Sequence, residues 1–188
     1  MANANLVTVG APKVGGAVFR APKGTSVPTS ATTTIGSTFV DLGFISEDGV
    51  SNDNARESEE IKDWGGSIVL TPQTEKKDTW KMTFLESKSV EVLKTIYGDG
   101  NVTGTLATGI TVKSNAEELE EHAWVIDMVT TDGDLKRITI PHGKVSEVGE
   151  VVYKNDEPVG FETTITAFPD ASGNTHYEYI IQKPTSGQ

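Results

Sequence analysis

The sequence predicts a mainly β protein in which two packed antiparallel sheets form a sandwich or a partly open barrel, with one short α-helix against them. Three observations support this class. Nineteen glycines and many Thr, Ser and Val residues favour strands joined by tight turns. Short segments alternate between apolar and polar residues, and only one segment has apolar residues at helical spacing. With 188 residues, no internal repeat and no linker, a single domain over 1–188 is expected.

Apolar and polar residues alternate in several short segments bounded by turn residues. Strands are expected over 16–20, 39–45, 67–74, 79–85, 123–131, 134–140, 160–168 and 176–182. In the second strand, Val40, Leu42 and Phe44 would share one half-buried face. The charged residues 75–78 are expected to turn the chain, so that 67–74 and 79–85 form a hairpin. Residues 1–14 are expected to be an arm, and residues 183–188 a short flexible tail.

One helix is expected after the fourth strand. Val90, Leu93 and Ile96 recur at helical spacing, Ser87 or Ser89 can cap the start, and Gly98 can end it. A helix this short must be stabilised by packing its apolar face on a sheet.

Asp132-Gly133 is a strong hairpin signal between the strands over 123–131 and 134–140. A two-residue turn would place Trp124, Ile126, Met128 and Leu135 on one face, and Val125, Val129, Ile138 and Ile140 on the other, beside Asp127 and Lys136. Both faces would then be partly apolar, which is unusual for a sheet with one wet side. We therefore expect one face to pack inside and the other to meet a partner.

The most unusual segment is residues 46–66, which reads as a long acidic loop without periodicity. Seven acids and two bases lie between Glu47 and Asp63, a net charge of −5. Loops this long in compact domains are usually functional or disordered. Ile61 and Trp64 would gain by burial, which favours an interaction loop that orders against a partner over a disordered insertion. The candidate contact residues are Glu47, Asp48, Asp53, Arg56, Glu57, Glu59, Glu60, Ile61, Asp63 and Trp64.

Composition and motifs exclude several functions. A net charge of −11 argues against gripping nucleic acid. The absence of cysteine excludes thiol catalysis and disulfides, and three scattered histidines do not form a metal-ligand pattern. No nucleophile elbow, phosphate-binding loop or calcium loop occurs. The first residues lack the features of a signal peptide, and no segment is long and apolar enough to span a bilayer. We expect a soluble protein that is not an enzyme and has no catalytic residues, metal or cofactor.

Six segments of the chain, in order, carry a resemblance to a known family. They are GAPKVGGAVFRAPKGT (10–25), DLGFISEDG (41–49), IKDWGG (61–66), TEKKD (74–78), VEVLKTIYG (90–98) and FPDASGNTHY (168–177). Together they resemble the major tail-tube proteins of long, non-contractile-tailed bacteriophages and related prophages. Each motif is short, and their shared order over nearly the whole chain carries the resemblance.

The resemblance implies a structural virion protein that assembles with itself into stacked, hexameric rings. These would form the tail tube, the conduit for DNA ejection into the host. The implied partners are further copies of the chain, the tape measure, tail terminator and baseplate or tip proteins, with DNA only in transit and no membrane. The protein would belong to the virion tail and be assembled in the host cytoplasm. The acidic loop would meet a neighbouring subunit, and Glu162 and Glu178 are candidates for acids that line the channel.

Two other functions stay open at this stage. A β-sandwich that binds a carbohydrate or a host surface would have the same strand pattern. A hydrolase with two carboxylates brought together by the fold would leave no local motif.

Overall fold

The computed structural model describes residues 2–3, 6–13 and 16–183. Its first strands are β1 (Gly10–Pro12), β2 (Val18–Pro22), β3 (Val40–Asp41), β4 (Ile45–Ser58), β5 (Ile61–Lys62), β6 (Ile68–Leu70) and β7 (Gln73–Phe84). Helix α1 (Val90–Tyr97) and the 3-10 turn η2 (Asp99–Asn101) follow. The remaining strands are β8 (Val102–Thr105), β9 (Gly109–Val112), β10 (Glu121–Thr130), β11 (Leu135–Val148), β12 (Phe161–Ala167) and β13 (Tyr177–Ile181). The predicted mainly β fold with one short α-helix is confirmed for the described residues.

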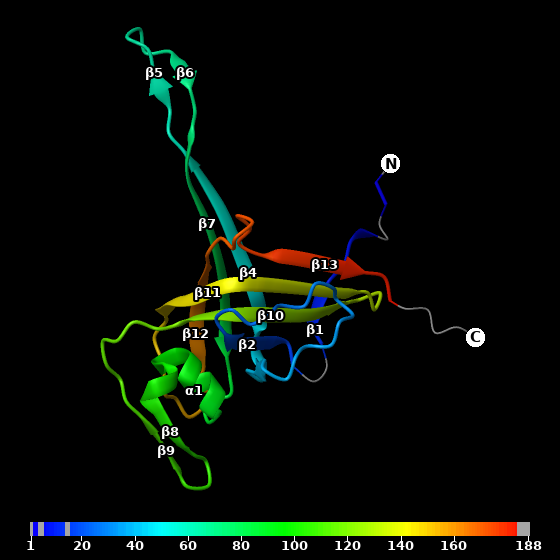
Figure 1. The fold of residues 1–188 in the computed structure, drawn as a ribbon, viewed down its shortest axis with the longest axis vertical. Helices are drawn as coiled ribbons and strands as arrows, with labels where there is room; N and C mark the ends of the chain where they lie inside the picture. Colours follow the sequence, from blue (N-terminus) through cyan, green and yellow to red (C-terminus); the bar gives the residue numbers. More distant parts are fainter. Residues whose placement is uncertain (1, 4–5, 14–15, 184–188) are drawn as a thin grey trace, which may run out of the picture.

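The principal sheet contains nine antiparallel strands. Its hydrogen-bonded order is β3-β2-β10-β11-β12-β7-β4, with β1 added to β10 and β13 added to β11. The path ends at β3 and β4, so the sheet is not closed into a barrel. It curls, because Val18 of β2 and Trp124 of β10 share one buried core with Trp80 of β7 and Ile165 of β12. Figure 1 shows the long strands crossing in this body, with α1 at one end and a hairpin projecting from the other.

Helix α1 forms as the sequence predicts. The Ser89 hydroxyl accepts a hydrogen bond from the Val92 N–H, and Gly98, at φ +97°, donates its N–H to the Lys94 carbonyl. Val92 and Ile96 are buried in the main core. The helix is therefore held by its caps and by its apolar face, as its short length requires.

The hairpin of β10 and β11 turns at Asp132-Gly133 as predicted, but its loop has three residues instead of two. Val129 pairs with Leu135, which leaves residues 131–133 as the loop. Gly133 lies at φ +85°, the left-handed conformation that the last residue of a three-residue hairpin loop adopts.

This extra loop residue shifts the strand register by one, so the predicted faces of β11 are wrong. A shift of one residue moves every side chain to the opposite face. Ile138 and Ile140 lie opposite Ile126 and Trp124 in the main core, whereas Leu135 lies beside Val129 on the other face. Lys136 likewise pairs with Met128, and Asp127 pairs with Arg137.

Both faces of this hairpin are apolar, as expected, but the protein itself covers the second face. Val125 packs there with Ala21 and Phe39, against Val27 and Ile35 from the segment over 23–39. The expectation that a partner covers this face is therefore wrong.

A buried ion pair fixes this covering segment. Arg137 donates to both carboxylate oxygens of Asp127, at 2.5 and 2.7 Å. Its Nη1 also donates to the carbonyl oxygens of Ser30, at 2.9 Å, and Thr33, at 2.5 Å. Arg137 and Asp127 are both buried, so one guanidinium joins β10, β11 and the covering segment.

Two further strand predictions are wrong in part. The strand over 39–45 shrinks to β3, with Leu42 buried just beyond it and Phe44 exposed, because Gly43 breaks the alternation at φ +73°. Residues 75–78 do not turn the chain. They continue the long strand β7, which pairs with β4 and β12.

Parts of the expected arm over 1–14 and of the expected tail over 183–188 lie outside the described residues. Within the expected arm over 1–14, residues Gly10–Pro12 form β1 on the edge of β10. In the expected tail over 183–188, only Lys183 lies within the described residues, and its N–H bonds to Asp134. None of the helices in the described part of the chain has the length and apolar character of a membrane span.

Candidate functional site

The expected acidic loop over 46–66 instead forms one strand and the tip of a long β-hairpin. β4 pairs with β7 from Val50–Met82 to Ser58–Gln73, and β5 pairs with β6 beyond it. We call residues 54–77 the arm. Figure 1 shows the arm projecting from the body, at the end opposite α1 and the β8–β9 hairpin. The hairpin was not predicted from the sequence because both of its strands are polar and lack the alternation that marks a half-buried strand.

The arm has no core of its own. All of residues 54–77 are exposed except Ala55 and Pro72, which are half-buried. A two-stranded hairpin without a packed face is only marginally stable in water. The arm therefore has the composition of an element that is completed by contact with another molecule.

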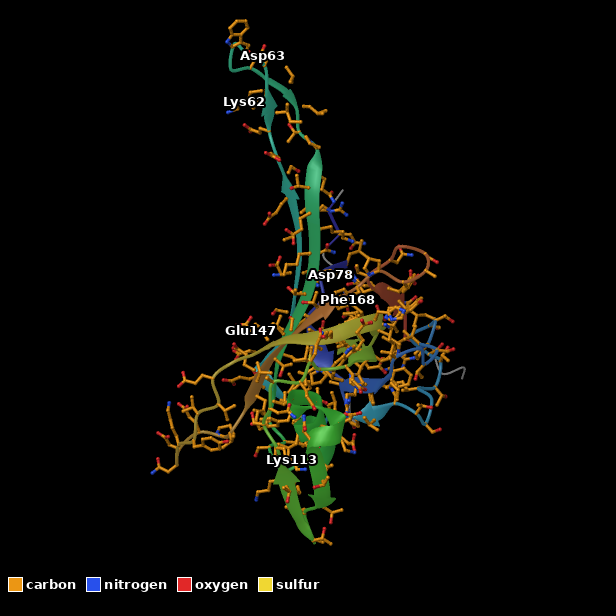
Figure 2. All side chains as sticks on the ribbon, turned by 60° about the vertical axis from the view of Figure 1, so that its left-hand side comes forward. Lys62, Asp63, Asp78, Lys113, Glu147 and Phe168 are labelled. Carbon is orange, nitrogen blue, oxygen red and sulfur yellow. The ribbon has the colours of Figure 1, made fainter. Side chains whose placement is uncertain are left out.

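The tip of the arm carries exposed apolar side chains. The tight turn at the tip is made by Asp63, whose carboxylate accepts the Ser67 N–H at 2.8 Å, and by Gly66 at φ +85°. Figure 2 shows Lys62 and Asp63 at this free end. The exposed apolar residues of the tip are Ile61, Trp64, Ile68, Val69 and Leu70, and Trp64 is fully exposed. Such a run on a surface marks an interaction site.

The shaft of the arm pairs like charges across its strands. Arg56 lies opposite Lys76, and Glu57 lies opposite Glu75. Like charges directly opposite each other destabilise a strand pair. Because adjacent residues point to opposite faces of a hairpin, the two like-charged pairs lie on opposite faces of the shaft, with Lys77 on the face of Glu57 and Glu75. A neighbouring molecule with complementary charge would relieve both repulsions.

The arm is joined to the body at Asp78, which is buried. Figure 2 shows Asp78 where the arm meets the body. Its carboxylate accepts hydrogen bonds from Asn52 on β4 at 2.8 Å, and from Thr175 and His176 at 2.5 Å each. His176 also lies edge-on to Trp80, with ring centroids 5.1 Å apart. We call this cluster the arm root, since it ties both arm strands to the segment before β13.

Hydrogen bonding to the ionised carboxylate controls the protonation of Asp78. Burial alone would raise its pKa, but the hydrogen bonds from His176, Thr175 and Asn52, and the charge of His176, outweigh burial and lower the pKa to about 2. Asp78 is therefore ionised at neutral pH.

The ten predicted contact residues divide between two places. Glu47 and Asp48 lie at the beginning of β4, on the body. Asp53 lies on β4 just before the arm, opposite Thr79. The others lie along the shaft and tip: Arg56, Glu57, Glu59, Glu60, Ile61, Asp63 and Trp64. The prediction missed Ile68, Val69 and Leu70, because an apolar run of three residues reads as a buried strand.

The two candidate channel acids are each paired with a lysine. Glu162, on the face of β12 that points away from the core, lies 2.9 Å from Lys81. Glu178 on β13 lies 2.9 Å from Lys136. Each acid therefore presents less net charge than its carboxylate alone would suggest.

One group of possible metal ligands occurs in the described residues, outside the arm. Ligand atoms of Asp99, Glu120 and His122 lie within 4.8 Å of one another. The Arg20 guanidinium already lies among them, 2.7 Å from Asp99 and 2.6 Å from His122 Nε2. Burial and the neighbouring Arg20 lower the pKa of His122, so the neutral ring accepts from Arg20 and donates its Nδ1–H to the Glu120 carbonyl. Arg20 therefore already supplies the positive charge beside these three residues.

Comparison with known proteins gives a family match over nearly the whole length. The family model described as phage tail tube protein matches residues 1–187. No curated protein matches the chain significantly. Among solved structures, the chain is similar to one in the cryo-EM structure of the anti-feeding prophage cap (AFP tube terminating cap). The identity is 8%, the TM-score is 0.47, and the match covers 93% of this chain and 95% of that chain.

Proposed function

Because the chain belongs to the phage tail tube protein family, and is thus a structural protein of the virion tail and not an enzyme, we propose that its copies form hexameric rings. These rings stack into the tube through which DNA is ejected into the host. The resemblance of the sequence motifs to major tail-tube proteins supports the ring and the channel. The exposed arm and the open edges of the sheet support assembly.

The arm is the observation that carries the proposal. It is an extended hairpin of 24 residues, over 54–77, with no buried side chain and an apolar tip. At about 3.4 Å per residue, its ten or so residues per strand reach about 35 Å beyond the body. An element of this kind gains stability only by contact with another molecule, and a neighbouring subunit in the same or an adjacent ring is the partner we propose.

The open sheet supports lateral contact within a ring. β3 and β4 end the hydrogen-bonded path, so each has a side on which another strand can add. Exposed strand edges favour uncontrolled association unless a defined interface uses them. A head-to-tail contact that closes after six copies would use the edges in this way.

The acidity of the protein suits a channel for DNA. An acidic surface repels the phosphate backbone and lets it slide, within the screening length of about 8 Å at physiological salt. Glu162 and Glu178 are the acids that we propose for the channel, and their pairing with Lys81 and Lys136 would keep this repulsion mild.

The tube would meet other tail proteins at its ends and in its lumen. We propose the tape measure protein inside, the tail terminator at one end and the baseplate or tip at the other. Assembly would take place in the host cytoplasm, before the virion is released.

Electron microscopy of the purified protein at high concentration tests the proposal. Uniform hollow tubes with six-fold end views are expected. Leu70→Lys, which places a charge in the apolar tip, should abolish tubes while leaving the fold of the free subunit unchanged. Leu70→Met keeps the tip apolar and should still assemble. Monodisperse particles that bind glycans would favour a carbohydrate-binding module instead.

A further inference from the structure

A cavity of about 520 Å³ lies in the body, between β1, the beginning of β4, and β10. Its apolar lining includes Pro12, Ala17, Val50, Ile126 and Met128. Its charged lining residues, Glu47 and Asp48, are both exposed. The cavity is therefore an apolar pocket with an acidic rim.

The cavity also contains a polar atom without a partner. The Ser46 hydroxyl oxygen is buried and forms no hydrogen bond with the described residues. A hydroxyl in this state can donate to, or accept from, a ligand group that reaches it.

The tip of the arm has the complementary features. Trp64 is fully exposed, and an indole combines a large apolar surface with one N–H donor that needs a partner when it is buried. Lys62, two residues earlier, is exposed, and its one ion-pair partner within the described part of the chain is the exposed Glu60 at 3.5 Å. The tip therefore offers an aromatic ring, a donor and a positive charge, where the pocket offers an apolar lining, an acceptor and negative charges.

The two surfaces of one copy cannot meet. The cavity lies at the beginning of β4, and Trp64 lies 15 residues beyond Gly49 along an extended hairpin, or about 50 Å at about 3.4 Å per residue. A Trp64 side chain that fills this cavity must therefore belong to a second copy of the chain.

We propose that Trp64 of one copy inserts into this cavity of a second copy. Its indole N–H donates to the Ser46 hydroxyl, its ring packs beside Met128, and Lys62 faces Glu47 and Asp48. Because the contact joins different surfaces of two copies, it is head-to-tail and can be repeated without closing. The inference rests on the proposed function and specifies which part of a neighbouring subunit receives the arm.

Tryptophan fluorescence tests the insertion directly. Trp80 and Trp124 are buried, so Trp64 is the tryptophan that acrylamide quenches in the free subunit. Assembly should protect it and shift its emission to shorter wavelength, and Trp64→Phe should remove this change. Trp64→Ala should raise the critical concentration for assembly about tenfold or more, as for an aromatic anchor at an interface. Tubes in which Trp64 stays as accessible as in the free subunit would overturn the inference.

Disulfide cross-linking locates the receiving site. The chain has no cysteine, so Lys62→Cys combined with Asp48→Cys introduces the only two thiols of each chain. Oxidised tubes should give a ladder of covalently linked chains on a non-reducing gel. The control pairs Lys62→Cys with a cysteine at the exposed Asp156 and should give none. Normal tubes without the ladder, or with an equal ladder in the control, refute the receiving site alone. A wild-type protein that forms no tubes refutes the proposed function and this inference together.

Discussion

Asp78→Asn is the most informative single substitution at the arm root. The carboxylate accepts hydrogen bonds from Asn52, Thr175 and His176, and its side chain is buried. Asparagine keeps the shape but removes the charge and turns one acceptor oxygen into a donor. At least one of the three surrounding donors would then lose its partner.

The lowered pKa of Asp78 sets the expected loss of unfolding free energy in this variant. A fall from 3.8 to about 2 means that folding stabilises the ionised form of Asp78 by about 2 kcal/mol relative to the protonated form. Because the folded pKa lies below the unfolded value, this stability is fully present above about pH 4 and is lost as the pH falls through 2. About half has gone by pH 3 and most of it by pH 2.

Urea unfolding of the free subunit, followed by tryptophan fluorescence, measures this contribution. The free energy of unfolding of the wild type should exceed that of Asp78→Asn by about 2 kcal/mol at pH 7. This difference should shrink as the pH falls toward 2. Asp156→Asn, at an exposed position, is the matched control and should show no such difference. A wild-type advantage that is the same at pH 7 and pH 2.5 would refute the hydrogen-bonded carboxylate as its source.

Three further outcomes are expected. Arg137→Met leaves the buried Asp127 with Lys13, at 3.4 Å, as its remaining ion-pair partner among the described residues. It should lower the free energy of unfolding by up to about 3–5 kcal/mol, measured by urea denaturation; a loss below 1 kcal/mol would contradict the role of the Arg137–Asp127 ion pair. Added salt should promote tube formation, measured by light scattering, because each chain carries −11 and six copies carry six times that charge; tubes that dissolve as salt rises would instead show that attractive charge pairs dominate. Glu75→Gln removes the repulsion from Glu57 and should raise the free energy of opening of the free arm by up to about 0.5 kcal/mol, measured as slower amide hydrogen exchange. Unchanged exchange would show that the repulsion is screened.

Local signals predicted the elements of the body well. Ser89 and Gly98 cap α1 because capping depends on a few adjacent residues, and the Asp132-Gly133 turn forms where the sequence indicates it. The register of β10 on β11 was not predictable from this dipeptide, because it fits loops of two or three residues equally well. That one-residue difference moved Ile138 and Ile140 into the main core. The covering of the second face of the β10–β11 hairpin was not predictable either, because residues 23–39 contact this face only in the folded chain.

The sequence suggests a contact role for the arm, which stays a prediction, but it does not reveal the hairpin. Ile61 and Trp64 identify it, since two large apolar residues in an acidic segment indicate a contact. Its strands have no inward face, so the alternation by which strands are recognised is absent. The pairing is set instead by the tight turn at Asp63 and by the anchoring of Asn52 to Asp78, about 11 residues away. Such long-range constraints are not visible in a local pattern.

The charges of the shaft and the apolar tip have opposite effects on association, and together they favour one mode of contact. Charged side chains along an exposed hairpin oppose its addition to other strand edges. The opposed pairs Arg56–Lys76 and Glu57–Glu75 place such charges on both faces, at some cost to the stability of the free arm. The tip carries the exposed apolar surface, which includes Trp64. The arm root holds the shaft to the body, so a contact made at the tip is transmitted to the subunit as a whole. An arm built in this way remains apart from other edges in the free subunit and gains stability only when its tip is bound.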